Sequence, residues 1–202
     1  MKYLLKQSFI PIVYLFFMAM ISIGIISIGN DLVWLKFILS VLNVALYCFL
    51  VGTIAFKEGE NALKVRIAND IERVQIIKTG EERPLKLQEE YKPWKGFVIG
   101  FITCVPLLVL LIVHTILYFA AGPQFNGGGV IASFVYMMFA SFVKLDSTVP
   151  LQQWHYYFTL IAVPVIMITT GLPYILGARK IQRQQDMIKE KQRQIYGDDY
   201  GK

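Results

Sequence analysis

The chain has 202 residues, of which 55% are hydrophobic and only 17% are charged. Water-soluble domains carry about 25% charged residues, so the composition indicates an integral membrane protein. The apolar runs described below are long enough for transmembrane helices and predict the all-α class. The composition excludes a disordered chain and, with two cysteines, a secreted domain held together by disulfides. The net charge of +6 is typical of membrane proteins, which keep basic residues on the cytoplasmic side. No nucleic-acid partner is therefore expected.

The first apolar run covers residues 8–28 and is long enough to cross a bilayer as a helix. It is too long for the hydrophobic region of a signal peptide, so we expect it to be retained. After a turn at 29–31, a second span runs to Phe56. Lys36 lies near its start and is expected to extend its charge outward to the interface. Residues 1–56 are thus predicted to form a transmembrane hairpin.

Residues 57–95 are polar and are predicted to form a cytoplasmic loop that contains one amphipathic helix. Its apolar residues recur at helical spacing and share one face, here called the apolar stripe: Leu63, Ile67, Ile71, Val74 and Ile77. Asn61 is the expected N-cap of this helix and Gly80 its stop. Acidic and basic residues nearly balance in the loop, which disfavours electrostatic binding to anionic lipid. The stripe is therefore predicted to bind a partner protein, and self-packing is the alternative.

The third span is predicted over 96–121 and the fourth over 154–177, which makes 96–177 a second transmembrane pair. Between them, the outer segment 122–153 begins with a glycine-rich loop. It continues into an apolar stretch over 130–143 that is short for a span. That stretch is predicted to be re-entrant or interfacial rather than spanning.

The tail, 178–202, is basic and is predicted to be helical. Of the 20 basic residues, all but Lys36 and Lys144 lie in the N-terminus, the polar loop and the tail. Placing these three segments inside satisfies the positive-inside rule and requires four spans. The sequence therefore predicts a multi-pass protein of the cell (inner) membrane with both termini cytoplasmic. Five spans with an external tail are the alternative.

Polar residues are scarce within the predicted spans. The amide of Asn43 is predicted to hydrogen-bond between helices, the alternative being a contact with a solute or ion. Gly96 and Gly100 form a GxxxG pattern, which permits close helix approach. We predict helix packing as the role of all three residues.

His114, Asp146 and His155 are the best candidates for a metal site, because all three are expected near the outer interface. They lack any local metal motif such as HExxH, so two interfacial histidines are the alternative. The sequence also lacks a phosphate-binding glycine loop and a nucleophile elbow. We therefore predict no cofactor, no metal and no enzymatic activity.

These features favour a non-enzymatic accessory or scaffold protein of the inner membrane, which binds a partner through its loop and tail. The alternative is a homo-oligomeric channel or a component of a small-solute transporter, in which Asn43 faces a shared axis. A third hypothesis is a membrane enzyme that uses His114 and His155 at the outer face.

Overall fold

The computed structural model describes residues 2–28, 32–80, 84–121, 134, 137–143 and 157–196. Across these ranges the regular structure is entirely helical, which confirms the predicted all-α class. The long helices are α1 (Lys2–Ile26), α2 (Val33–Thr79), α3 (Lys95–Ala121) and α7 (Ala162–Tyr196). The short elements are η2 (Met137–Phe139), α5 (Ala140–Val143) and η3 (Tyr157–Ile161).

Each of the four long helices contains a stretch that is long and apolar enough to cross a membrane. Large apolar side chains cover their outer surfaces, among them Phe9, Phe17, Phe49 and Phe119. An exposed apolar surface of this extent is costly in water but suits lipid. The described part of the chain therefore has the character of a multi-pass membrane protein.

Helix α2 continues far beyond its apolar part, which ends at Phe56. Its 47 residues correspond to a length of about 70 Å at 1.5 Å per residue. The predicted separate helix with an N-cap at Asn61 is wrong, because α2 passes through this position without a break. The predicted stop is confirmed: Gly80 has a left-handed φ of 72°, and its N–H donates to the carbonyl oxygen of Ile76.

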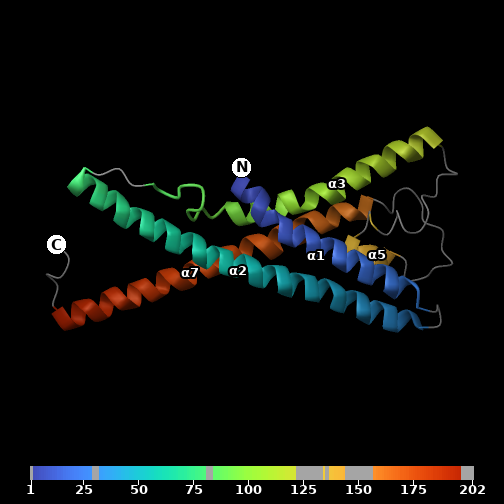
Figure 1. Cartoon of the computed structure of the whole chain (residues 1–202). Coiled ribbons are helices and arrows are strands. Elements are labelled where there is room, and N and C mark those ends of the chain that lie inside the picture. Colours follow the sequence, from blue (N-terminus) through green and yellow to red (C-terminus); the bar gives the residue numbers. More distant parts are fainter. Residues whose placement is uncertain are drawn as a thin grey trace.

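Helix α7 is also continuous, so the basic tail extends the last span without a break as far as Tyr196. Figure 1 shows α2 and α7 crossing and then separating toward their C-terminal ends. Helices α1 and α3 complete the bundle, and each contacts a neighbour on the crossing pair. We call residues 57–79 the α2 arm and residues 178–196 the α7 arm.

The core of the bundle contains side chains from all four long helices. It includes Leu15, Met18, Tyr47, Val51, Leu107 and Ile166, which are fully buried. The starts of α1 and α3 meet the two arms at one end of the bundle. There Lys95 lies over the Tyr3 ring and Lys180 lies over the Phe56 ring, each at 5.5 Å from the centroid. We call this region the charged end.

Glycines bring the crossing helices into backbone contact. A Cβ atom at Gly59 would clash with the carbonyl oxygen of Tyr174, and one at Gly177 would clash with that of Phe56. Small residues allow such approach because no side chain separates the backbones. The two clashes are reciprocal, so the backbones of α2 and α7 are in close contact at these two glycines.

Candidate functional site

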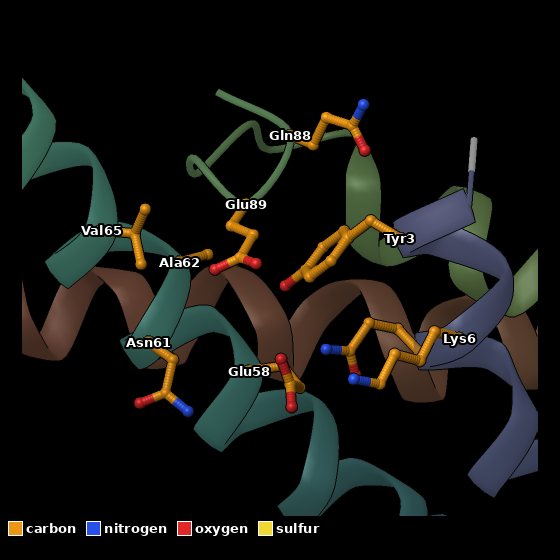
Figure 2. Close-up of a pocket in the computed structure, with 9 residues that line it drawn as sticks. Tyr3, Lys6, Glu58, Asn61, Ala62, Val65, Gln88 and Glu89 are labelled. Atoms are coloured by element: carbon orange, nitrogen blue, oxygen red, sulfur yellow. The ribbon is translucent and has the colours of Figure 1, made fainter. Parts of the chain in front are cut away.

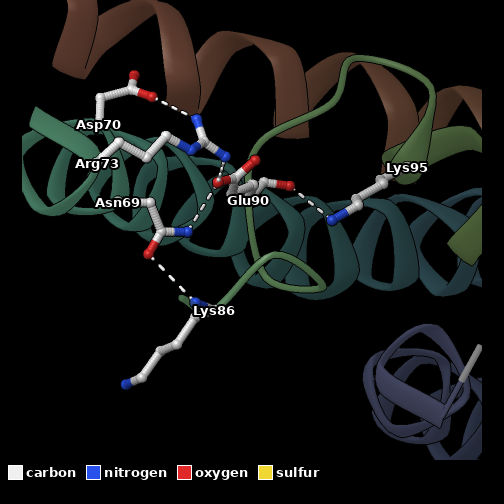
Figure 3. A network of polar contacts seen from close by, with 6 residues as sticks. All are labelled: Asn69, Asp70, Arg73, Lys86, Glu90 and Lys95. Atoms are coloured by element: carbon white, nitrogen blue, oxygen red, sulfur yellow. Dashed lines mark hydrogen bonds and ion pairs between the residues drawn. The ribbon is translucent and has the colours of Figure 1, made fainter. Parts of the chain in front are cut away.

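A segment between α2 and α3 folds back along the α2 arm, and we call its residues 84–94 the bracket (Figure 3). The Glu90 carboxylate accepts hydrogen bonds from Asn69 at 2.8 Å and from Arg73 at 2.6 Å. Asn69 also accepts a bond from the backbone N–H of Lys86 at 3.2 Å. Bonds to a charged group are stronger than neutral ones, so Glu90 is the main attachment of the bracket to α2.

The other end of the bracket is fixed by Lys95 and Tyr91. The buried Lys95 ammonium donates to the carbonyl oxygens of Gln88 and Glu90, both at 2.6 Å. The Tyr91 N–H donates to the carbonyl oxygen of Ala62 at 3.0 Å. Its ring stacks on Tyr174 of α7 with centroids 5.5 Å apart. The bracket thus links α2, α3 and α7 at the charged end.

A polar cleft of about 480 Å³ lies between the start of α1, the α2 arm and the bracket (Figure 2). Its polar lining comes from three segments: Tyr3, Lys6 and Gln7 of α1, Glu58 and Asn61 of α2, and Gln88 and Glu89 of the bracket. The Tyr3 hydroxyl points toward the carboxylates of Glu58 and Glu89. The volume falls within the range of about 300–1,000 Å³ found for small-ligand sites.

Negative charge dominates this cleft. Glu58 lies beyond the apolar part of α2, and partial burial raises the pKa of its carboxyl group. The nearby Glu89 carboxylate raises that pKa further, whereas the Tyr3 hydroxyl and the Lys6 ammonium lower it. In the described lining, two half-buried carboxylates therefore face one ammonium, that of Lys6.

A second concave surface lies between the two arms, where they begin to separate. It is lined from α2 by Ile67, Asp70, Ile71, Val74, Gln75 and Lys78, and from α7 by Gln185 and Lys189. We call it the arm groove. Ile71 and Val74 are 57% and 52% exposed there, and Ile77 beyond them is 83% exposed. Most of the apolar stripe is therefore uncovered in the described structure.

The first two stripe residues differ from the rest: Leu63 and Ile67 are half-buried close to the crossing. On α7, Ile181 is buried, but Ile188 and Ile195 are 56% and 71% exposed. Because the helices diverge, the tail covers only the beginning of the stripe. Self-packing thus accounts for Leu63 and Ile67 but not for the exposed positions that follow.

The predicted packing residues lie between helices. The Asn43 amide donates to Met18 O at 3.1 Å and to Ser22 Oγ at 2.9 Å, which joins α2 to α1. Gly96 and Gly100 lie against α7, where added Cβ atoms would come within 2.7 Å of Tyr174 Cβ and 2.8 Å of Met167 Cα.

The predicted outer-face residues are only partly described. His114 is buried in the bundle rather than open at an interface, whereas Asp146 and His155 lie outside the described residues. Within the ranges that are described, no three His, Cys, Asp or Glu side chains are grouped to hold a metal ion. Lys36 departs from expectation, because it is fully buried instead of extending to the surface.

Sequence reasoning missed the bracket, the polar cleft, and the glycine pair Gly59 and Gly177. The bracket residues show no helical period, and their partners lie up to 21 positions away in sequence. Gly59 and Gly177 lie on different helices, so no local spacing connects them.

Compared with known proteins, the chain matches no protein-family model, no curated protein and no solved structure.

Proposed function

We propose that this protein is a non-enzymatic membrane scaffold whose two helical arms hold a partner protein on the cytoplasmic side. The observation that carries the proposal is the continuity of α2 and α7 beyond their apolar parts. Two long helices that leave the bundle and diverge form an open frame, not a closed core. The concentration of basic residues on the arms and at the helix starts supports a cytoplasmic location.

The exposed apolar residues of the arms support a docking role. Ile71 and Val74 on α2 line a groove whose other wall is the α7 arm, and Ile77 is exposed one turn further along α2. Contiguous apolar surface bordered by polar residues is typical of protein interaction sites. The spacing of the stripe suits one amphipathic helix lying between the arms.

The charge of the α7 arm favours an acidic partner. The α7 arm is rich in basic residues and poor in acidic ones: Arg179, Lys180, Arg183, Lys189, Lys191 and Arg193 against Asp186 and Glu190. A second copy of this arm carries the same charge, so two copies repel each other there. An acidic amphipathic helix of a different protein is complementary in both charge and apolar pattern.

The test is purification of the full chain from its own membranes in mild detergent, with the mass and composition of the complex measured together. Ile71, Val74 and Ile77 are changed to Ser in one variant, and Leu87 on the bracket is changed to Ser in the control. Leu87 is also exposed, at 54%, so both changes leave buried packing intact. We expect a defined complex with an acidic partner in the wild type and the control, and its loss from the triple variant.

Two outcomes would contradict the scaffold proposal. One is a homo-oligomer that persists in the triple variant, which would direct attention to flux measurements on a channel. The other is a monomer without any stoichiometric partner. A complex that survives the triple substitution unchanged would place the docking surface elsewhere on the chain.

A further inference from the structure

We propose that the polar cleft at the charged end binds ethanolamine phosphate, with its primary ammonium between Glu58 and Glu89 and its phosphate at Lys6. The membrane-borne form of this group is the headgroup of phosphatidylethanolamine. This inference is independent of the partner proposed for the arms, because the cleft and the arm groove share no lining residue.

The depth of the cleft matches a lipid headgroup. The apolar part of α2 ends at Phe56, and the α2 residues that line the cleft follow it directly, from Glu58 to Val65. At 1.5 Å per residue these positions begin about 3 Å beyond the apolar layer. The headgroup region extends about 5–8 Å on each side of the hydrocarbon core. The cleft therefore opens at the level where headgroups lie.

The excess of carboxylates in the cleft favours the binding of a cation. Glu58 and Glu89 are both half-buried and lie close enough to interact electrostatically. Among the described residues that line the cleft, Lys6 is the sole basic one. Lys95 is nearby, but its ammonium is engaged by the carbonyl oxygens of Gln88 and Glu90. An ammonium group between the two carboxylates relieves their repulsion.

The lining favours a primary over a quaternary ammonium. A primary ammonium donates three hydrogen bonds, and the cleft offers carboxylate oxygens from Glu58 and Glu89 and amide oxygens from Asn61 and Gln88. Quaternary ammonium groups are bound instead by cages of several aromatic rings. Tyr3 is the sole aromatic residue among the described residues of the lining, so the cleft is suited to ethanolamine rather than choline.

Lys6 accounts for the phosphate. Its side chain is exposed at the start of α1 and lies at the edge of the cleft, beside Glu58 (Figure 2). An ammonium at this position binds a phosphate as a point charge. The zwitterion thus meets two carboxylates at one end and one ammonium at the other, which complements its own charge distribution.

The test is native mass spectrometry of the purified full chain with equal amounts of dioleoyl phosphatidylethanolamine and dioleoyl phosphatidylcholine. The acyl chains are identical, so a difference in retention reports the headgroup. We expect about tenfold preferential retention of phosphatidylethanolamine, equivalent to about 1.4 kcal/mol. Equal retention of the two lipids by the unaltered chain would by itself show that the cleft does not select the phosphatidylethanolamine headgroup.

The double variant Glu58→Gln/Glu89→Gln keeps the shape of the cleft and removes both charges. It is expected to lose the preference, whereas Asp186→Asn/Glu190→Gln, with the same change in charge on the exposed α7 arm, is expected to keep it. Lys6→Gln is expected to lower the retention of both lipids, because both carry the phosphate that Lys6 binds. An undiminished preference in the Glu58/Glu89 variant would overturn the assignment of these carboxylates.

A second arm separates the lipid from a soluble source of the same group. Soluble ethanolamine phosphate is titrated calorimetrically into the lipid-depleted chain. Heat that disappears in the Glu58/Glu89 variant would support the site with a soluble ligand, even if the two lipids are retained equally. Lipid preference without such heat would support the membrane source. Failure of both arms would overturn the proposal.

Discussion

Gly59 and Gly177 set the distance between α2 and α7 where these helices cross. Each lies against the backbone of the opposite helix, at Tyr174 and Phe56 respectively. The absence of a side chain at these positions brings the backbones together at the base of both arms. These two glycines therefore fix the separation of α2 and α7 at the base of the arms.

Replacing Gly59 or Gly177 with Ala is expected to destabilise the protein by at least about 1–3 kcal/mol, because an added methyl group forces two backbones apart. The control is Gly24→Ala in α1, where nothing described lies within 4 Å of the added Cβ. Alanine in a helix is favoured over glycine by about 0.5–1 kcal/mol, so the control should be neutral or stabilising. Thermal unfolding in one detergent measures all three variants, and equal Tm values would refute the contact.

Glu90 holds the bracket against the α2 arm through Asn69 and Arg73. Glu90→Gln is expected to weaken this attachment by about 1–3 kcal/mol, because bonds to a charged acceptor are lost. Hydrogen exchange should accelerate over 84–94. Asp70→Asn is the control, since its bond to Arg73 is exposed and surface pairs contribute about 0–1 kcal/mol. Unchanged exchange in Glu90→Gln would show that other contacts hold the bracket.

At the scale of elements, the sequence predicts the helices better than their boundaries. The spacing of Leu63, Ile67 and Ile71 correctly indicates a helix, and Gly80 correctly indicates its end. The break expected before Asn61 is absent. A charged stretch that contains Gly59 resembles a loop start when read alone. The glycine is retained within the helix because its lack of a side chain allows the contact with α7.

The sequence predicts the candidate sites less well than it predicts the helices. The cleft is assembled from Tyr3, Glu58 and Glu89, which lie on three separate segments. The periodicity of residues within one segment does not indicate which residues of other segments they contact. The apolar stripe was found because its residues share one helix, but its partial covering by α7 depends on the angle between two helices.

A continuous α2 predicts a specific distance between its apolar part and the end of its arm. Spin labels at Thr53 and Lys78, in a chain with Cys48 and Cys104 replaced, should be about 38 Å apart along the axis. The distribution should be narrow, because one helix joins the two positions. A control pair at Lys64 and Lys78, separated by about 21 Å, lies within the arm alone. A broad or much shorter distance for the first pair only would indicate a break near Asn61.

At the scale of the whole molecule, most charged residues of the described ranges lie at one end of an apolar bundle and on the arms that leave it; Lys36, buried near the start of α2, is an exception. Lys6, Lys95 and Lys180 come from three helices, and their surroundings meet at the charged end. The two arms leave the bundle from this same end (Figure 1). Under the positive-inside rule, we expect this end and both arms to lie on the cytoplasmic side.

Single cysteines placed at Lys78 on the α2 arm and at Lys189 on the α7 arm test this orientation. Both positions are exposed, and Cys48 and Cys104 are replaced beforehand. A membrane-impermeant maleimide should label both in inverted membrane vesicles and neither in intact cells. Labelling of Lys189→Cys from the outside would contradict the four-span arrangement and support the five-span alternative.

The crossing of α2 and α7 has a mechanical consequence. When two stiff helices are joined at one contact, the angle between them is the same on both sides of that contact. The pivot is the contact at Gly59 and Gly177, with arms on one side and lipid-embedded halves on the other. As long as neither helix bends, a protein that draws the arms together also changes the spacing of the bundle within the bilayer. A force that changes the angle between the arms thus also changes the angle between the apolar halves of α2 and α7.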